Sequence, residues 1–351
     1  MNKAAIIYAL ASAALFGVST PAAKALLGSI HPAVLAGLLY CGAGIGVAIL
    51  RRFALPSLGL ANAPQVALSR RDIRWLALAI GSGGVAGPLF MMLGLAQTEA
   101  ATASLLLTFE GAATAIIAWF VFRENVDRRI ALGMLCLVVG AVLLSWSGTA
   151  RFEANIGPLA ILGACVAWGL DNNLTRKVSL ADPLQIVELK GLVAGPVNLA
   201  LGLWAGGLLP PAFPAVLAMI VGFLGYGVSL ALFVVSLRYL GAARTGAYFS
   251  TAPFLGAVTA VIALGEPITA QLLAAGALMA LGIWLHVTER HEHEHIHEAM
   301  MHAHPHVHDE HHQHAHRPED PPGEPHTHSH EHQPIEHAHP HTPDMHHLHR
   351  H

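Results

Sequence analysis

Histidine residues are concentrated near the C-terminus, in the run HEHEHIHEAMMHAHPHVHDEHHQHAH at residues 291–316. Most stand at every second position, with acids and small residues between them: His291, His293, His295, His297, His302, His304, His306, His308, His311, His312, His314 and His316. Imidazole suits nickel, cobalt, zinc and copper, and the interleaved carboxylates add oxygen ligands. We therefore expect this segment to bind a divalent metal ion, although its composition does not choose among these four.

A second set of reactive groups lies inside long apolar runs. Glu110 occurs in LLLTFEGAATA, the residues Asp171, Asn172 and Asn173 occur in WGLDNNLT, and Glu188 occurs in IVELKG. An ionisable group at membrane depth costs a few kcal/mol or more, so such residues are candidates for function. We expect these five residues to line a transport cavity in which Glu110 and Asp171 relay a cation or a proton.

Each of these acids also has a structural explanation. Glu110 could be a fixed hydrogen-bond acceptor between helices, and Asp171 could pair with Arg176 near the inner surface. Glu188 and Lys190 are two residues apart and face different sides of a helix. Partners on neighbouring helices are therefore favoured for these two residues over contact with a substrate.

The runs that hold these acids predict a membrane protein. Charged residues make up 12% of the chain and hydrophobic residues 54%. About 20 apolar residues cross a hydrocarbon core, and helices satisfy their own backbone polar groups there. We predict an all-α membrane protein with ten transmembrane helices, near residues 4–27, 32–50, 75–95, 100–122, 130–147, 157–175, 183–208, 214–237, 245–264 and 268–287.

Basic residues indicate the orientation of these spans. With the N-terminus in the cytoplasm, 14 Lys and Arg residues fall in the inner segments and only Lys24 and Arg151 in the outer ones. This bias follows the positive-inside rule. Because the number of spans is even, we expect a multi-pass protein of the cell inner membrane with both termini cytoplasmic.

The chain also aligns with itself. LFGVSTPAAK, from Leu15, aligns with AWGLDNNLTR, from Ala167, and LAQTEAATA, from Leu95, aligns with LRYLGAART, from Leu237. Each half holds five predicted spans, an odd number, so the two copies must insert with opposite topology. The repeat divides the chain into two five-helix halves at residues 1–147 and 157–288, followed by a tail at 291–351.

Two segments carry a family resemblance. GLAQTEAATASLLL and SLRYLGAARTGAYFSTAPFLGAVTAVIALGEPIT, with an aromatic-Gly pair in the first span of each half, resemble EamA-type members of the drug/metabolite transporter superfamily. The resemblance covers residues 1–288 and implies a ten-helix fold, a central cavity and export driven by an ion gradient or the substrate's own gradient. It leaves the substrate open, since the family carries amino acids, nucleobases, sugars and other metabolites. Nickel-efflux members of the superfamily are similar in carrying a His-rich end.

Two functions are compatible with these features. In the first, the protein exports a divalent transition-metal cation, nickel or cobalt above all, and the tail captures metal on the cytoplasmic side. In the second, it exports a small metabolite such as an amino acid, and the tail buffers or senses metal. The sequence favours the first. We expect no enzymatic activity, because no catalytic motif occurs. The expected partners are the lipid bilayer and the transported ion or metabolite, but not nucleic acid. The sequence leaves open whether the protein forms a homodimer.

The tail is expected to be disordered. Residues 291–351 hold 23 of the 25 His and 11 acids, against two Arg. This composition, with several Pro residues, predicts a soluble extension without regular structure. We expect no required cofactor, only metal bound by the tail. Imidazole titrates near pH 6.5 and must be neutral to bind metal, so binding should weaken as the pH falls from about 7.5 to 5.5.

Overall fold

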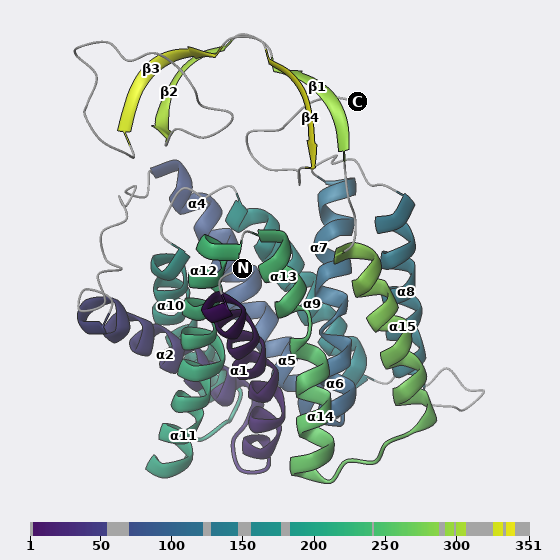
Figure 1. The fold of residues 1–351 in the computed structure, drawn as a ribbon. Coiled ribbons are helices and arrows are strands. Elements are labelled where there is room, and N and C mark those ends of the chain that lie inside the picture. Colours follow the sequence, from purple (N-terminus) through teal and green to yellow (C-terminus); the bar gives the residue numbers. More distant parts are fainter. Residues whose placement is uncertain are drawn as a thin grey trace. The chain divides into compact units, whose positions relative to one another are not determined.

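Helices and short connections form the described part of the chain up to Val287 in the computed structural model (Figure 1). The structure describes residues 3–54, 70–121, 128–146, 156–176, 183–240, 242–287, 292–297, 300–306, 326–332 and 335–340. The first half contains α1 (Lys3–Leu27), α2 (Pro32–Ile49), η1 (Leu50–Ala54), α4 (Arg70–Ala79), η2 (Ile80–Ala86), α5 (Gly87–Ala96), α6 (Ala100–Leu106), α7 (Phe109–Phe120) and α8 (Arg128–Ser145). The second half contains α9 (Ile156–Arg176), α10 (Pro183–Trp204), α11 (Ala212–Gly222), η3 (Phe223–Val228), α12 (Ser229–Leu240), α13 (Ala242–Phe249), α14 (Ala252–Leu264) and α15 (Ala270–Val287). Helical segments thus occupy all ten of the ranges predicted from hydropathy.

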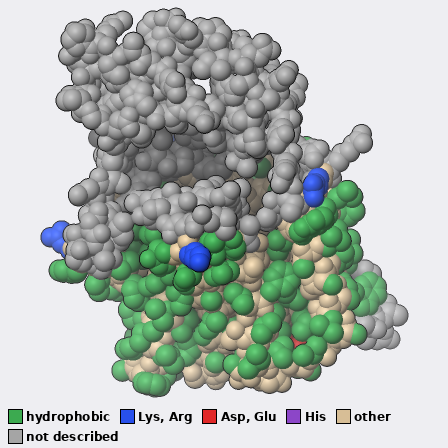
Figure 2. All heavy atoms as spheres, in the orientation of Figure 1, with side chains coloured by type: hydrophobic (Ala, Val, Ile, Leu, Met, Phe, Trp, Pro, Cys, Tyr) green, Lys and Arg blue, Asp and Glu red, His purple; other side chains and the backbone are tan. Residues whose placement is uncertain are grey.

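The outer surface of this helical unit is apolar. Within the described residues, six helical stretches are long and apolar enough to cross a membrane: Lys3–Leu27, Pro32–Phe53, Ile73–Ala96, Ala100–Phe120, Leu184–Trp204 and Ala212–Phe233. Trp204, Phe213 and Ile262 are 88%, 79% and 77% exposed. Figure 2 shows one face, on which hydrophobic side chains cover most of the described surface. A patch of this extent is a liability in water and suits the hydrocarbon of a bilayer.

The two halves meet through close helix crossings. Helix α2 packs along α10, α5 packs along α9, and α1 packs against both α12 and α14. A Cβ atom on Gly37 would lie 2.5 Å from the backbone nitrogen of Leu199, and one on Gly44 would lie 2.5 Å from that of Leu192. Small residues at such crossings let backbones approach, which is how helices associate where lipid removes the hydrophobic effect.

Two helices are irregular at corresponding places in the two halves. The π-helical turns η2 and η3 fall at nearly the same position when Leu95 is aligned with Leu237. In the same alignment, the break between α6 and α7 corresponds to the break between α13 and α14. A π turn carries an extra residue and disturbs the regular backbone ladder, and such turns are frequent at functional sites.

Two charged side chains satisfy backbone groups near the connection from α5 to α6. Lys24 on α1 donates to the carbonyls of Leu95, at 2.7 Å, and Thr98, at 2.8 Å. Glu266 accepts the N–H groups of Ala100 and Ala101, at 2.6 and 2.7 Å. A cation at the end of one helix and an anion at the start of the next both complement the helix dipoles.

The tail belongs to a separate compact unit, Glu289–His351, distinct from the helical unit Met1–Thr288. Strand β1 (Glu292–His297) pairs antiparallel with β4 (Ile335–Pro340), and β2 (Met300–His306) pairs antiparallel with β3 (His326–His332). Alternation of His with other residues has the two-residue period of a strand. The disordered tail at residues 291–351 stays a prediction.

Candidate functional site

A cavity of about 550 Å³ lies among the helices of the first unit. Its lining comes from both halves of the chain: Phe16, Tyr40, Ala43, Leu107, Thr108, Glu110, Gly111, Ala115, Leu137, Trp168, Asp171, Asn172, Val187, Lys190, Gly191, Gly225, Tyr226, Ser229, Leu230, Phe249, Ser250, Ala252, Pro253 and Ile283. The charged residues in this described lining are Glu110, Asp171 and Lys190. The cavity is thus mostly apolar, with a few polar groups that could orient a solute.

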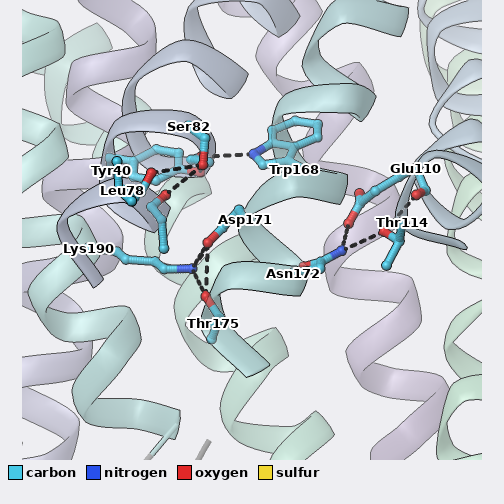
Figure 3. A network of polar contacts seen from close by, with 12 residues as sticks. Tyr40, Leu78, Ser82, Glu110, Thr114, Trp168, Asp171, Asn172, Thr175 and Lys190 are labelled. Carbon is cyan, nitrogen blue, oxygen red and sulfur yellow. Dashed lines mark hydrogen bonds and ion pairs between the residues drawn. The ribbon is translucent and has the colours of Figure 1, made fainter. Parts of the chain in front are cut away.

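An ion pair joins α9 and α10 at the cavity. Lys190 donates to both carboxylate oxygens of Asp171, at 2.6 Å to Oδ1 and 2.8 Å to Oδ2 (Figure 3). The hydroxyl of Thr175, one turn along α9, donates to Oδ1 at 2.9 Å and accepts from Lys190 at 3.1 Å. The side chains of Lys190 and Asp171 are only 15% and 9% exposed. Because both charges are desolvated, each depends on the other for compensation.

Glu110 is held differently. It lies in the first turn of α7, where the positive end of the helix dipole favours a carboxylate. The amide of Asn172 donates to Glu110 Oε1 at 3.0 Å and to the hydroxyl of Thr114 at 3.2 Å (Figure 3). The ion pairs formed among the described residues do not include Glu110. Its carboxylate therefore has a neutral donor but no positive partner within the described chain.

The π turn η2 is fixed beside this ion pair. The carbonyl of Gly83 accepts hydrogen bonds from the Tyr40 hydroxyl at 3.0 Å and the Trp168 indole at 2.9 Å. Asn198 donates to the carbonyl of Gly84 at 2.9 Å. These side chains, from α2, α9 and α10, supply partners to an irregular backbone stretch inside the bundle, where water is scarce. A Cβ atom on Gly83 would lie 2.0 Å from Asp171 Oδ2, so glycine is required for this close approach.

Aromatic rings form another part of the lining. Phe16 packs edge-on against Tyr226, with ring centroids 5.9 Å apart, and lies 5.4 Å from Phe249. Tyr40 lies 5.9 Å from Tyr226. These separations are typical of favourable aromatic pairs. The rings extend from α1 across η3 to α13 and give a solute a large apolar surface.

The structure brings together three of the five cavity residues expected from the sequence: Glu110, Asp171 and Asn172 line the same cavity. Asn173 does not join them; it is buried and donates to the carbonyls of Thr114 and Gly169, at 3.0 and 2.8 Å. Asn173 thus ties α9 to α7.

Glu188 also lies outside the described cavity lining, and it pairs with Arg51 in η1, which follows α2. The expectation that Glu188 and Lys190 take partners on neighbouring helices is confirmed. Asp171 pairs with Lys190 on α10, and the side chain of Arg176, the partner considered from the sequence, lies outside what the structure describes. Sequence reasoning missed Lys190 as a cavity residue, although its position well inside a predicted span was a usable signal.

The predicted metal-binding residues are only partly within the described chain. His293, His295, His297, His302, His304 and His306 lie on β1 and β2, whereas His291, His308, His311, His312, His314 and His316 lie outside the described residues. Among the side chains described in residues 3–287, no group of three His, Cys, Asp or Glu residues could hold a metal ion. The described cavity therefore offers two carboxylates and an ammonium group, not a clustered metal site.

The chain is similar to known membrane transporters. The model of the EamA-like transporter family matches residues 3–146 and 155–288. An uncharacterized transporter of Methanothermobacter thermautotrophicus is 29% identical over 283 residues, which cover 77% of this chain and 82% of that protein. A probable amino-acid metabolite efflux pump of Salmonella typhimurium is 24% identical over 205 residues, covering 54% of this chain and 67% of that protein. A probable 4-amino-4-deoxy-L-arabinose-phosphoundecaprenol flippase subunit ArnE of Pseudomonas fluorescens is 35% identical over 108 residues, covering 31% of this chain and 92% of that subunit.

A solved crystal structure of a protein shares the fold. It aligns with a TM-score of 0.56 and 18% sequence identity, covering 82% of this chain and 96% of that chain. At this identity the likeness concerns the fold alone.

Proposed function

Because this chain belongs to the EamA-like transporter family, we propose that it exports a small organic solute bearing a positive group through the cavity between its halves. One observation carries the proposal: the Glu110 carboxylate is held by Asn172, takes no positive partner within the described chain, and faces a cavity with a largely apolar and aromatic lining. An anion without a cation inside a membrane protein is costly. A cationic group on the solute, or a proton, compensates it.

This arrangement provides a way to couple transport to an ion gradient. The solute's positive group and a proton compete for the same carboxylate of Glu110. Solute leaving outward is then replaced by a proton entering inward, so that the acid is not left charged and unpaired. Asn172 keeps the carboxylate in place in both states, and the rings of Phe16, Tyr226 and Phe249 bind the apolar part of the solute.

The cavity favours an organic solute over a transition-metal cation. Nickel and cobalt prefer sites that include imidazole or several anionic ligands, and the described cavity brings the Lys190 ammonium to within 2.6 Å of one of its two carboxylates. The preference for nickel or cobalt export that the sequence alone suggested is therefore not retained. The second reading, export of a metabolite with metal buffered or sensed by the tail, has the better support.

We further propose ten membrane-crossing helices arranged as an inverted repeat, with both termini cytoplasmic. The contacts between halves support this arrangement, since α5 against α9 corresponds to α12 against α1, and α7 against α9 corresponds to α14 against α1. The matching irregularities at η2 and η3 add to it. The bias of 14 inner against two outer basic residues supports the orientation.

Transport in everted inner-membrane vesicles tests the proposed site. Glu110→Gln should lower proton-driven uptake of amino acids and related amines at least about tenfold, because a hydrogen bond to a charged group contributes roughly 1.5–3 kcal/mol. Glu188→Gln is the matched control, since it removes an acid that the described cavity lining excludes. Equal loss in both variants, or no loss in either, would contradict the role of Glu110. Nickel or cobalt uptake that depends on Glu110, without organic uptake, would restore the metal-export reading.

A further inference from the structure

Thr114 lies one turn after Glu110 on α7, and its hydrogen bonds have a definite direction (Figure 3). Its hydroxyl donates to the backbone carbonyl of Glu110 at 2.8 Å and accepts from the Asn172 amide nitrogen at 3.2 Å. Its backbone carbonyl accepts from Asn173 at 3.0 Å, which ties this turn of α7 to α9. A hydroxyl has a single proton to donate. Because that proton is used on the backbone of α7, the Thr114 oxygen only accepts from Asn172.

This direction fixes which end of the Asn172 amide faces Glu110. The last torsion of an asparagine side chain is broad and roughly two-fold. Asn172 is exposed and lines the cavity, so burial does not select one orientation. Its nitrogen donates both to Thr114 and, at 3.0 Å, to Glu110 Oε1. Turning the amide over would place its oxygen against the Thr114 oxygen, whose proton is already used.

A fixed donor distinguishes between the two forms of the Glu110 side chain. An ionised carboxylate only accepts hydrogen bonds, whereas a protonated carboxyl group has a proton to donate and needs an acceptor. An amide that turns freely serves either form, with its nitrogen or with its oxygen. An amide held by Thr114 serves the carboxylate alone, and the carboxylate is the form that binds a positive group on the solute.

The close packing of the helices does not require threonine at position 114. A Cβ atom on Gly169 of α9 would lie 2.9 Å from the backbone nitrogen of Thr114, and one on Gly17 of α1 would lie 3.0 Å from that of Gly256 on α14. In the alignment of the two halves, Gly256 takes the place of Thr114. The same close approach therefore forms with glycine in the second half, so the threonine side chain is not needed for it.

We propose that Thr114 is a positioning residue that fixes Asn172 as a hydrogen-bond donor, so that Glu110 favours the positive group of the solute over a proton. The inference rests on the proposed function, since it concerns the same carboxylate. Thr114 itself is absent from the described cavity lining and acts through the Asn172 amide.

Other titratable groups also surround Glu110. Those in the described lining are Tyr40 on α2, Asp171 on α9, Lys190 on α10 and Tyr226 on η3, and Cys165 on α9 interacts with Glu110 electrostatically. The remaining helices contribute side chains without ionisable groups to the described lining. All these groups stay in place when only Thr114 is changed, so a difference between Thr114 variants reports on the amide.

Uptake of radiolabelled tyramine, a cationic amine with an aromatic ring, into everted vesicles tests the proposal at a mildly acidic and a mildly alkaline pH. Thr114→Val should raise the KM about three- to tenfold at the acidic pH, the effect of about one neutral hydrogen bond, because the released amide turns and accepts from protonated Glu110. At the alkaline pH the KM should approach that of the wild type. Thr114→Ser keeps the hydroxyl and should restore the wild-type KM at both pH values.

Two further variants separate positioning from a general loss of structure. Thr259 on α14 donates to the carbonyl of Leu255 at 2.7 Å, the same bond to the preceding turn that Thr114 makes, so Thr259→Val should leave the KM unchanged. In an Asn172→Ala background, Thr114→Val should add no further change, because its effect passes through the amide.

Infrared spectra of the purified protein at acidic pH give a second readout, which needs no solute. The carboxyl stretching band of protonated Glu110 is assigned by its loss in Glu110→Gln. Thr114→Val should shift this band to lower frequency, because the released amide oxygen accepts the Glu110 proton, and Thr114→Ser and Thr259→Val should not. This band decides the inference whether or not tyramine is transported.

The outcomes separate this inference from the proposed function. If Glu110→Gln takes up tyramine like the wild type, the proposed function fails. If Glu110→Gln loses uptake while Thr114→Val keeps the wild-type KM and band, only the role of Thr114 is overturned. An equal rise in KM at both pH values, or a rise that Thr114→Ser shares, would also overturn it, because the loss would then be structural.

Discussion

Two corners of the cavity correspond in the aligned halves but differ in chemistry. In one corner, Gly83 of η2 lies against Asp171, whose carboxylate is bound by Lys190. In the other corner, Gly225 of η3 lies against Ser19, which donates to the carbonyl of Phe16 at 2.6 Å. A Cβ atom would approach its neighbour to 2.0 Å at Gly83 and to 2.5 Å at Gly225. The backbone packing is the same in kind, and the side chains are polar in one corner and small or apolar in the other.

The same contrast holds for the neighbouring positions. With Leu15 aligned to Ala167, Lys190 takes the place of Leu38. With Leu95 aligned to Leu237, Glu110 takes the place of Ala252. The aligned positions in the other half hold the uncharged residues Leu38 and Ala252, so helices pack there without charge. We infer that the polar corner, with Asp171 and Lys190, binds the solute, whereas the corner of Gly225 and Ser19 only shapes the cavity. The following changes test that division.

Breaking the ion pair should have the largest effect on stability. Asp171→Ser and Lys190→Leu install the residues found at the corresponding positions. Each alone leaves one charge unpaired in a site where the partners are 9% and 15% exposed, so it should destabilise the protein by about 3–5 kcal/mol. Thermal unfolding in detergent, followed by loss of soluble protein on heating, measures this.

The double variant Asp171→Ser with Lys190→Leu is the control. It removes both charges and should recover most of the lost stability, because an apolar replacement of a buried pair is often neutral. Export should stay impaired in all three variants. Additive destabilisation in the double variant would mean that the two residues act independently, which would break the comparison between the corners.

Adding a side chain where η2 packs against α9 should have an intermediate effect on stability. Gly83→Ala places a methyl group where Asp171 Oδ2 lies, and overpacking of this kind costs about 1–3 kcal/mol. The control is Gly81→Ala, two residues earlier in the same π turn, where a Cβ would meet nothing within 4 Å. Unfolding temperatures of the two variants should differ clearly, with Gly81→Ala near the wild type. If both variants unfold at the same temperature, the close approach to Asp171 does not restrict the residue at position 83.

The ion pair of Arg51 and Glu188 should contribute least to stability. Arg51 and Glu188 are 18% and 23% exposed, more than the pair in the cavity. Glu188→Gln should therefore destabilise the protein less than Lys190→Leu does, with a smaller difference from the wild type at high salt. Unfolding measured at low and at high salt checks this. If Glu188→Gln destabilised the protein as much as Lys190→Leu, the difference in exposure between the two ion pairs would not explain their contributions to stability.

Hydropathy and self-alignment located most of the elements because both are local properties of the chain. Apolar runs of spanning length coincide with helical segments in every predicted range, and alignment of Leu95 with Leu237 already relates the two π turns. The acids Glu110 and Asp171 were recognised for the same reason: an ionisable residue in an apolar run is visible without its neighbours.

Only the tertiary structure shows which side chains form ion pairs and hydrogen bonds with one another. Asp171 pairs with Lys190, 19 residues away on another helix, and Glu188 pairs with Arg51, 137 residues away. The partners of the Gly83 carbonyl, Tyr40 and Trp168, lie 43 and 85 residues from it. The sequence determined which residues are costly in a membrane, because that cost belongs to each residue and its apolar surroundings. Only packing determined which groups offset the cost, because distances between helices depend on the whole bundle.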